Sequence, residues 1–249
     1  MWDSSLVLLA LAGLVAGVAN TVAGGGSLLT LPALMACGLP ANAANATNRV
    51  GVLVQSLSAS GVYAREKALD VRGTGWISLP TVVGALLGAQ ISVEMDEWWF
   101  RRVIALVMCG VLVSLFVQPK RWLESSTERN AFGRVAQTVL FFGVGLYAGF
   151  IQAGVGVLFL VALVWGRGKD LVEANGMKVL LVALLTIPAL GLFLFQDLVW
   201  WKEGCACAVG QLFGGVVGAR LTLSWGAGFV RWLLAIVVVV SVIHLFGWM

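Results

Sequence analysis

The stretch Ser5–Cys37, SLVLLALAGLVAGVANTVAGGGSLLTLPALMAC, decides the fold of this chain. It is apolar almost throughout, and the run AGGGS at residues 23–27 interrupts it. Each glycine lowers helix propensity by about 1 kcal/mol relative to alanine, so we expect a helix break there. At 1.5 Å per residue the whole stretch reaches roughly 50 Å. That is too long for one membrane span and short for two, so a continuous span and a hairpin of two short helices both remain open.

The composition of the whole chain places it in a membrane. Of 249 residues, 60% are hydrophobic and 11% are charged, whereas a soluble domain has about 25% charged residues. So little charge excludes a soluble enzyme, a disulfide scaffold and a disordered chain. The basic residues behind the net charge of +4 lie in short loops between apolar runs, which is typical of topology signals. We therefore predict an all-α polytopic membrane protein that contacts the lipid bilayer and no nucleic acid.

The two halves of the chain resemble each other. GLVAG at residues 13–17 returns as GLYAG at 145–149, and VVGALLGAQIS at 82–92 returns as LFGGVVGARLT at 212–222. Several matches in one order indicate a duplicated unit. The predicted units are a first repeat over residues 1–117 (broken hairpin 5–38, helices 45–63, 75–93 and 98–117), a cytoplasmic linker over 118–134, and a second repeat over 135–249.

The distribution of Lys and Arg favours the hairpin. Apart from Arg49 and Lys178, a hairpin that returns to its starting side places eleven basic residues on one side and three on the other, whereas a continuous span gives eight and six. The eleven are Arg65, Lys67, Arg72, Lys120, Arg121, Arg129, Arg134, Arg167, Lys169, Arg220 and Arg231, and the three are Arg101, Arg102 and Lys202. The positive-inside rule makes the basic side cytoplasmic. We therefore expect a multi-pass protein of the bacterial inner membrane with both termini outside, whose second half is inverted, as in secondary transporters.

The two helix breaks are the candidate binding site. The first contains Asn20, Thr21, Gly24–Gly26 and Ser27, and the second spans Gln152–Gly156. Backbone freed by a break at membrane depth must line protein or a wet cavity. The positive end of the helix that follows Gly25 and Gly26 makes the break a cradle for an anion. Alternatively, glycines only allow helices to pack closely, which is the interpretation we prefer for Gly84, Gly88, Gly210, Gly214 and Gly218.

A polar stripe follows one face of the helix predicted at residues 45–63. At 100° per residue its members fall within roughly 140° of one another; they are Asn45, Asn48, Arg49, Gln55, Ser56 and Ser60. Such a stripe on a membrane helix is expected to face a cavity. Lys178 with Asn175 repeats the pattern, so each half supplies one cation and one asparagine near a helix start. The alternative is that both cations extend to opposite membrane interfaces.

Several chemistries have no support in the sequence. No predicted span carries Asp or Glu near its centre, which argues against a cation channel or a carboxylate site for Na⁺. HExxH, Walker A and GxSxG motifs are absent, so we predict neither an enzymatic reaction nor a cofactor. The four cysteines are expected to pack as small apolar side chains and not to bind a metal.

The run GLVAGVANTVAGGGSLLTLPALMACGLPANAANATNRVGVLVQSLSASG at residues 13–61 resembles the first signature of the sulfite exporter TauE/SafE family of membrane permeases. The shared features are the glycine-spaced helix, the glycine-rich break, Pro32, the GLP at 38–40, and Thr47 with Asn48. GLYAGFIQAGVGVLFLVAL at 145–163 with LVEANGMKVLL at 171–181 resembles the second repeat of that family. Asn20 and Thr21 stand where many members have a further glycine, which adds polarity to the break.

This resemblance implies a secondary carrier for sulfur oxyanions or organosulfonates, working by alternating access. We expect the small anion to be bound by Asn20, Thr21, Gly25, Gly26, Ser27, Asn48 and Arg49 from one side and by Gln152, Asn175 and Lys178 from the other. The alternatives are a gated anion channel, a carrier for another small anion, and a membrane scaffold. The sequence allows a homo-oligomer without requiring one.

Overall fold

The structure, a computed structural model, describes residues 4–106 and 132–246, with side chains as far as residue 226. All regular secondary structure within these residues is helical. Four helical segments of this part are long and apolar enough to cross a bilayer: α1 (Ser4–Ala23), α4 (Val71–Glu94), α9 (Leu171–Phe195) and residues Trp201–Gly226 of α10. The predicted all-α polytopic membrane fold is confirmed.

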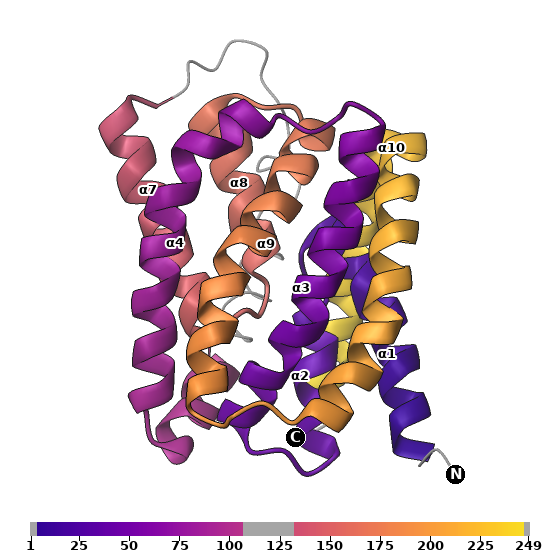
Figure 1. Cartoon of the computed structure of the whole chain (residues 1–249). Coiled ribbons are helices and arrows are strands. Elements are labelled where there is room, and N and C mark those ends of the chain that lie inside the picture. Colours follow the sequence, from indigo (N-terminus) through magenta and orange to yellow (C-terminus); the bar gives the residue numbers. More distant parts are fainter. Residues whose placement is uncertain (1–3, 107–131, 247–249) are drawn as a thin grey trace.

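The first half begins with a hairpin. α1 runs from the lower end of the molecule in Figure 1 into the bundle, and α2 (Ser27–Ala36) runs back toward that end. The chain reverses at Gly24, whose φ of +80° belongs to the left-handed region that glycine adopts without strain. α3 (Ala41–Arg65) then crosses to the upper end, α4 returns, and a further helix starts at residue 97.

The second half enters from the opposite end. α7 (Arg134–Phe150) descends from the upper end, the chain breaks at residues 151–154, and α8 (Val155–Arg167) returns upward. α9 then descends, and α10 (Trp201–Phe246) ascends and turns back at Gly226, where φ is +68°. Two hairpins entering from opposite ends are what an inverted duplication predicts. The limits of the repeats stay a prediction, since much of the expected helix 98–117 and linker 118–134 lies outside the described residues.

Two helices begin a turn earlier than predicted, at Ala41 in place of Asn45 and at Leu171 in place of Asn175. The carboxylate of Glu97 accepts hydrogen bonds from the first amides of α3, and Asp170 accepts them from Val172 and Glu173 at the start of α9. These acceptors satisfy amides that have no partner within the helix.

The longer helices carry both cations inward. Arg49 and Lys178 lie about two turns inside α3 and α9 and are 0% and 1% exposed. Neither side chain reaches a membrane interface, so the interface alternative is wrong.

Glycines bring the two halves into backbone contact. A Cβ on Gly145 or Gly149 of α7 would overlap the carbonyl oxygen of Thr81 or Ala85 on α4. Likewise, a Cβ on Gly13 of α1 would overlap a carbonyl oxygen of α10. Each hairpin therefore packs on a long helix of the other half. The packing interpretation is confirmed for the five glycines assigned to it, Gly84, Gly88, Gly210, Gly214 and Gly218, each of which contacts the facing helix closely.

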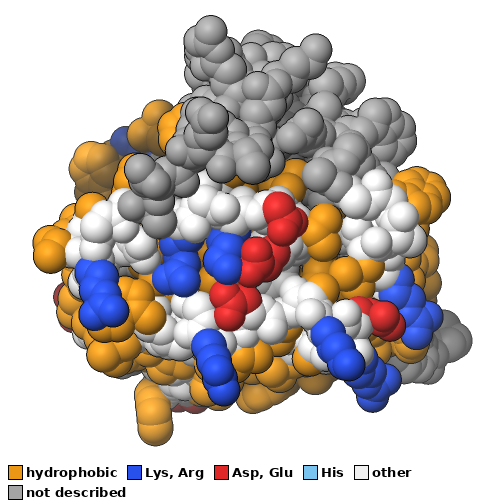
Figure 2. Space-filling model, turned by 90° about the horizontal axis from the view of Figure 1, so that it is seen from above, with side chains coloured by type: hydrophobic (Ala, Val, Ile, Leu, Met, Phe, Trp, Pro, Cys, Tyr) orange, Lys and Arg blue, Asp and Glu red, His pale blue; other side chains and the backbone are white. Residues whose placement is uncertain are grey.

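The upper end of the molecule is the more basic one. Figure 2 views this end and shows Lys and Arg side chains spread over it, with acidic side chains grouped near its middle. Seven of the eleven basic residues assigned to one side belong to helix ends or loops here: Arg65, Lys67, Arg72, Arg134, Arg167, Lys169 and Arg220. Lys120, Arg121 and Arg129 lie outside the described residues, as does the side chain of Arg231.

Two glycines of α7 provide a matched test of this packing. We expect Gly145→Ala to destabilise the protein by about 1–3 kcal/mol, because its Cβ would meet the backbone of α4. Gly143→Ala is the control: no atom lies within 4 Å of its Cβ, and alanine favours the helix by up to about 1 kcal/mol. Unfolding in detergent, followed by circular dichroism, measures both. Equal stability of the two variants would contradict close α4–α7 packing.

Candidate functional site

The two helix breaks meet in the interior of the bundle. A Cβ on Gly24 would overlap the backbone of Gly156, and one on Gly156 would overlap Gly24. The first break and the first turn of α8 therefore touch through bare backbone. Gly154, which precedes α8, has a φ of +68°, so each break contains a glycine in the left-handed region.

Lys178 binds the open end of α1. Its ammonium group donates to the carbonyl oxygens of Asn20 and Thr21 at 3.1 and 2.7 Å, and to the side-chain oxygen of Asn175. Asn175 also donates to the carbonyl of Val22 at 3.0 Å. The last carbonyls of a helix have no partner within it and carry partial negative charge. Lys178 and Asn175 of the second half therefore cap a helix of the first half.

Arg49 does the same for α7. Its Nη2 donates to the carbonyl oxygens of Ala148, at 3.1 Å, and Gly149. Asn45 donates to the carbonyl of Phe150 at 3.0 Å. Each cation therefore caps a helix of the other half. Lys178 lies with Asn20 and Thr21, whereas the sequence repeat predicts it on the opposite side of the site, with the residues of its own half.

In each half, a hydrogen bond between a glutamine and a threonine joins the break to a long helix of the same half. Gln55 of α3 accepts from Asn20 and donates to Thr21, both at 2.6 Å. In the second half Gln152 donates to Thr186 of α9 at 3.1 Å. Both Gln–Thr pairs join residues 34 positions apart, with the two residue types exchanged between break and helix. Gln55, predicted on the polar stripe but not among the anion-binding residues, and Thr186 therefore also contact the breaks, and repeat spacing pairs the two.

The beginning of α2 is held by Asn48. The Asn48 amide donates to the Ser27 hydroxyl at 3.1 Å and accepts from the Thr30 hydroxyl at 2.6 Å. The N-cap residues of α2 and α8 are glycines, Gly26 and Gly154, which have no side chain to cap the helix. Amides of the first turns bond instead to backbone carbonyls of the breaks. At Gly26 the packing interpretation applies, because a Cβ there would overlap the carbonyl oxygen of Ala16. Gly25 is buried beside it in the break.

The described structure leaves several buried polar atoms near the breaks without a hydrogen-bond partner. They include Nε and Nη1 of Arg49, Oε1 of Gln152, the hydroxyl of Ser56 and Oδ1 of Asn45. The Arg49 guanidinium also lies 4.8 Å from the centre of the Phe193 ring. Buried polar groups normally have partners, so these atoms are candidate contacts for a polar ligand.

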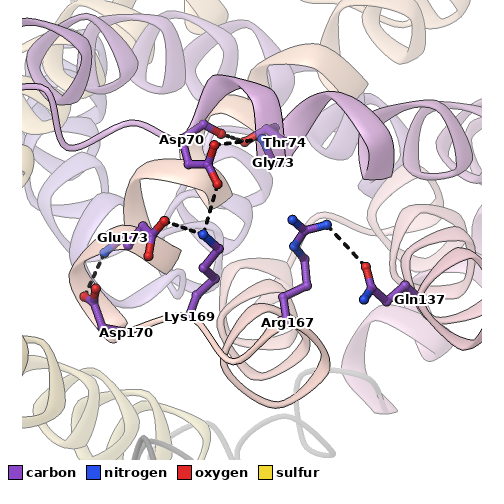
Figure 3. Close-up of polar contacts among 8 residues, drawn as sticks. All are labelled: Asp70, Gly73, Thr74, Gln137, Arg167, Lys169, Asp170 and Glu173. Atoms are coloured by element: carbon purple, nitrogen blue, oxygen red, sulfur yellow. Dashed lines mark hydrogen bonds and ion pairs between the residues drawn. The ribbon is translucent and has the colours of Figure 1, made fainter. Parts of the chain in front are cut away.

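A second polar cluster joins the halves at the basic end. Lys169, between α8 and α9, binds Asp70, which precedes α4, at 3.0 Å and also binds Glu173 (Figure 3). The backbone amide of Gly73 and the Lys169 ammonium lower the pKa of the Asp70 carboxyl. Partial burial opposes the charge on Lys169, but its hydrogen bonds to Glu173 and Asp70 raise its pKa overall. Both groups are therefore charged at neutral pH.

Comparison with known sequences identifies the family of the chain. The sequence profile described as sulfite exporter TauE/SafE matches residues 9–245. The chain belongs to the TauE/SafE family. It is 32% identical to the probable membrane transporter protein YfcA of Escherichia coli K12 over 225 residues, covering 90% of this chain and 83% of that protein.

Two further relatives carry similar names. A probable membrane transporter protein of Haemophilus influenzae is 27% identical over 91% of this chain and 88% of its own length. The probable membrane transporter protein ORF9 of a Sinorhizobium species is 27% identical over 96% and 92%. No solved structure matches the chain significantly. The chain is thus a multi-pass membrane protein of a transporter family.

The capping role of Lys178 can be tested by removing its charge. We expect Lys178→Met to destabilise the protein by roughly 1–3 kcal/mol, because the buried carbonyl of Thr21 loses its donor and that of Asn20 keeps only the Gly24 amide. Lys67→Met is the control: Lys67 is exposed at the α3–α4 turn, so the change should stay within about 0.5 kcal/mol. Unfolding of both variants in the same detergent measures the difference. A Lys178→Met variant as stable as the control would show that Lys178 does not stabilise the end of α1.

Proposed function

We propose that the chain carries a small sulfur oxyanion or organosulfonate across the inner membrane by alternating access, and that the anion binds beside the two helix breaks. The observation that supports this most is the sign of the buried charge. Among the described residues the buried ionisable side chains of Lys, Arg, Asp and Glu are Arg49 and Lys178, and both are basic. No carboxylate is buried with them in this part of the chain.

The helix ends offset only part of that charge. A helix C-terminus is equivalent to roughly −0.5 elementary charge, whereas each cation carries +1. Two buried cations on two such ends leave the interior positive, and burying uncompensated charge is costly. A bound anion would remove the excess. Nε and Nη1 of Arg49 offer it donors, and the positive ends of α2 and α8 begin at the two breaks.

The sulfur chemistry of the substrate follows from the family and not from this geometry. The family takes its name from a sulfite exporter. Sulfite and sulfonates present three oxygens on one sulfur atom, which suits several converging donors. A site with no buried carboxylate among the described residues also favours an anion over a metal cation or an amine.

The arrangement of the hairpins supports alternating access. α1 with α2 enters from one end and α7 with α8 from the other, and each is capped by a cation from the opposite half. A movement of one half therefore shifts the capped hairpin of the other. Inverted halves that rock about a midplane site are the common construction of secondary transporters.

Ligand binding and transport test this proposal. Sulfite, or a small sulfonate, should raise the unfolding temperature of the purified protein, since a ligand at 100 times its Kd stabilises by about 2.7 kcal/mol. Proteoliposomes should show saturable exchange of the same anion. Arg49→Gln should abolish the anion-dependent shift, whereas Arg65→Gln, on an exposed residue, should keep it. Conductance in a planar bilayer would favour a channel, and no response to any anion would overturn the proposal.

We also propose that the basic end faces the cytoplasm, which places both termini outside. Seven of the described basic residues lie at that end and three at the other, and the positive-inside rule sets orientation from this asymmetry. A reporter active only in the cytoplasm should be silent when fused after Met249. The same reporter inserted at Lys67, in the exposed α3–α4 turn, should be active. The reverse pattern would invert the orientation.

A further inference from the structure

The basic end of the molecule contains a cavity that lies apart from the two helix breaks. Its volume is about 340 Å³, and it is lined by Arg72, Gly73, Trp76, Arg134, Gln137 and Arg167. Three of these six residues are arginines, and none is acidic. They come from the start of α4, the start of α7 and the end of α8. The cavity therefore sits where helices of both halves meet at the membrane surface.

The guanidinium of Arg167 is fixed in place. Its Nη1 donates to Oε1 of Gln137 at 3.2 Å (Figure 3). Gln137 in turn donates to the carbonyl of Phe132 at 2.7 Å. Its Nη2 lies close to Gly73, 3.1 Å from where a Cβ would stand. Its Nε is buried and has no partner among the described residues. Arg167 thus presents an unused donor in a fixed direction.

The neighbouring charges leave the cavity positive. Asp70, beside Gly73 of the cavity wall, receives hydrogen bonds from the Gly73 amide and from Lys169. Lys169 also binds Glu173, so this cluster keeps a net charge of −1 (one cation against two carboxylates). The three arginines exceed that charge. Arg72, Arg134 and Arg167 have no carboxylate among the residues that share their cavity. Arginine groups with free donors suit an oxyanion that accepts two bonds at once.

The outer wall of the cavity continues into exposed apolar side chains, as a surface in contact with the hydrocarbon layer would. Arg134 lies over the ring of Trp76, 5.4 Å from its centre, and Trp76 is half exposed. Three residues further along α4, on the same helix face, Leu79 is 70% exposed, and on the adjacent α7 Val135 is 79% exposed. α4 and α7 pack directly against each other. An apolar surface thus runs from the arginines along both helices, as acyl chains attached to a bound head group require.

We propose that Arg72, Arg134 and Arg167 form a binding site for a phosphate group at the membrane interface, carried by an anionic lipid whose acyl chains lie along α4 and α7. Basic pockets between membrane helices are a known way to recognise such head groups. Inorganic phosphate presents the same chemistry without acyl chains and is the other source to distinguish. This site is independent of the identity of the transported substrate, so the proposal does not rest on the proposed function.

Titration of the delipidated full-length protein tests this site. Phosphatidylglycerol, diacylglycerol and inorganic phosphate are each added in neutral detergent, and the unfolding temperature is followed. Phosphatidylglycerol should stabilise the protein and diacylglycerol should not, because only the first carries a phosphate. Each basic residue near an anionic lipid contributes about fivefold in affinity, so Arg134→Gln with Arg167→Gln should weaken the lipid response roughly 25-fold. The matched control, Arg65→Gln with Arg220→Gln, changes two exposed arginines of the same end and should keep it.

The outcomes distinguish a lipid site, a site for soluble phosphate and no site at all. A response to phosphatidylglycerol that the cavity variant loses, with no effect of inorganic phosphate, supports the lipid. An equal response to inorganic phosphate, also lost in the cavity variant, supports the phosphate site but assigns it to a soluble ion. If the control loses the response as much as the cavity variant, or neither loses it, the site is overturned. Should the glutamine pair fail to fold, Arg134→Gln and Arg167→Gln are made singly, each with an expected loss of about fivefold; an unchanged response in both single variants also overturns the site.

Discussion

The structure depends on two buried cations, Lys178 and Arg49, each of which caps a helix of the other half. A helix that ends inside a membrane protein leaves carbonyl groups without partners in a medium that supplies none. Here α1 and α7 both end in this way, and Lys178 and Arg49 bind their last carbonyls. Each cation comes from the half that does not contain the broken helix. The broken hairpins can exist because the other half completes them.

Glycine makes this capping across the two halves geometrically feasible. A long side chain two turns inside α3 or α9 reaches the end of a hairpin helix only if the helices lie close. Gly145 and Gly149 let α7 approach α4, and Gly13 lets α1 approach α10. At the centre Gly24 and Gly156 bring the two hairpins into backbone contact. Close packing and capping therefore support each other, and the packing gains van der Waals contact where the hydrophobic effect offers little.

In the proposed mechanism, the same construction links stability to transport. Arg49 uses one terminal nitrogen to cap α7 and keeps Nε and Nη1 free. A residue that both holds a helix end and faces the site with free donors can respond to an anion by shifting that helix. Lys178, by contrast, has its ammonium occupied by three oxygens. The two cations are equivalent in position but unequal in free donors, which makes Arg49 the stronger candidate for direct contact with substrate.

Sequence by itself determined the membrane class, the helix breaks, and which polar residues of one half correspond to those of the other. These features are local: hydropathy over a span, glycine against helix propensity, and repeat spacing. It also contained a signal that the prediction passed over, since Asp170 and Glu173 form the start pattern of a capped helix and place the beginning of α9 at Leu171. For α3 no such local signal exists, because the acceptor is Glu97, more than fifty residues away.

The tertiary structure decided which groups meet. Arg49 lies 99 and 100 residues from the carbonyls that it binds, and Lys178 lies 158 and 157 residues from its own. Periodicity reports the face of a helix on which a residue stands, but not the partner that this face meets. That partner is set by the close approach of α1 to α10 and of α7 to α4, since each of these contacts joins a helix of one half to a helix of the other. Only when the halves are packed does a lysine of one become the cap of the other, because the unpaired carbonyls that attract it exist only in the folded bundle.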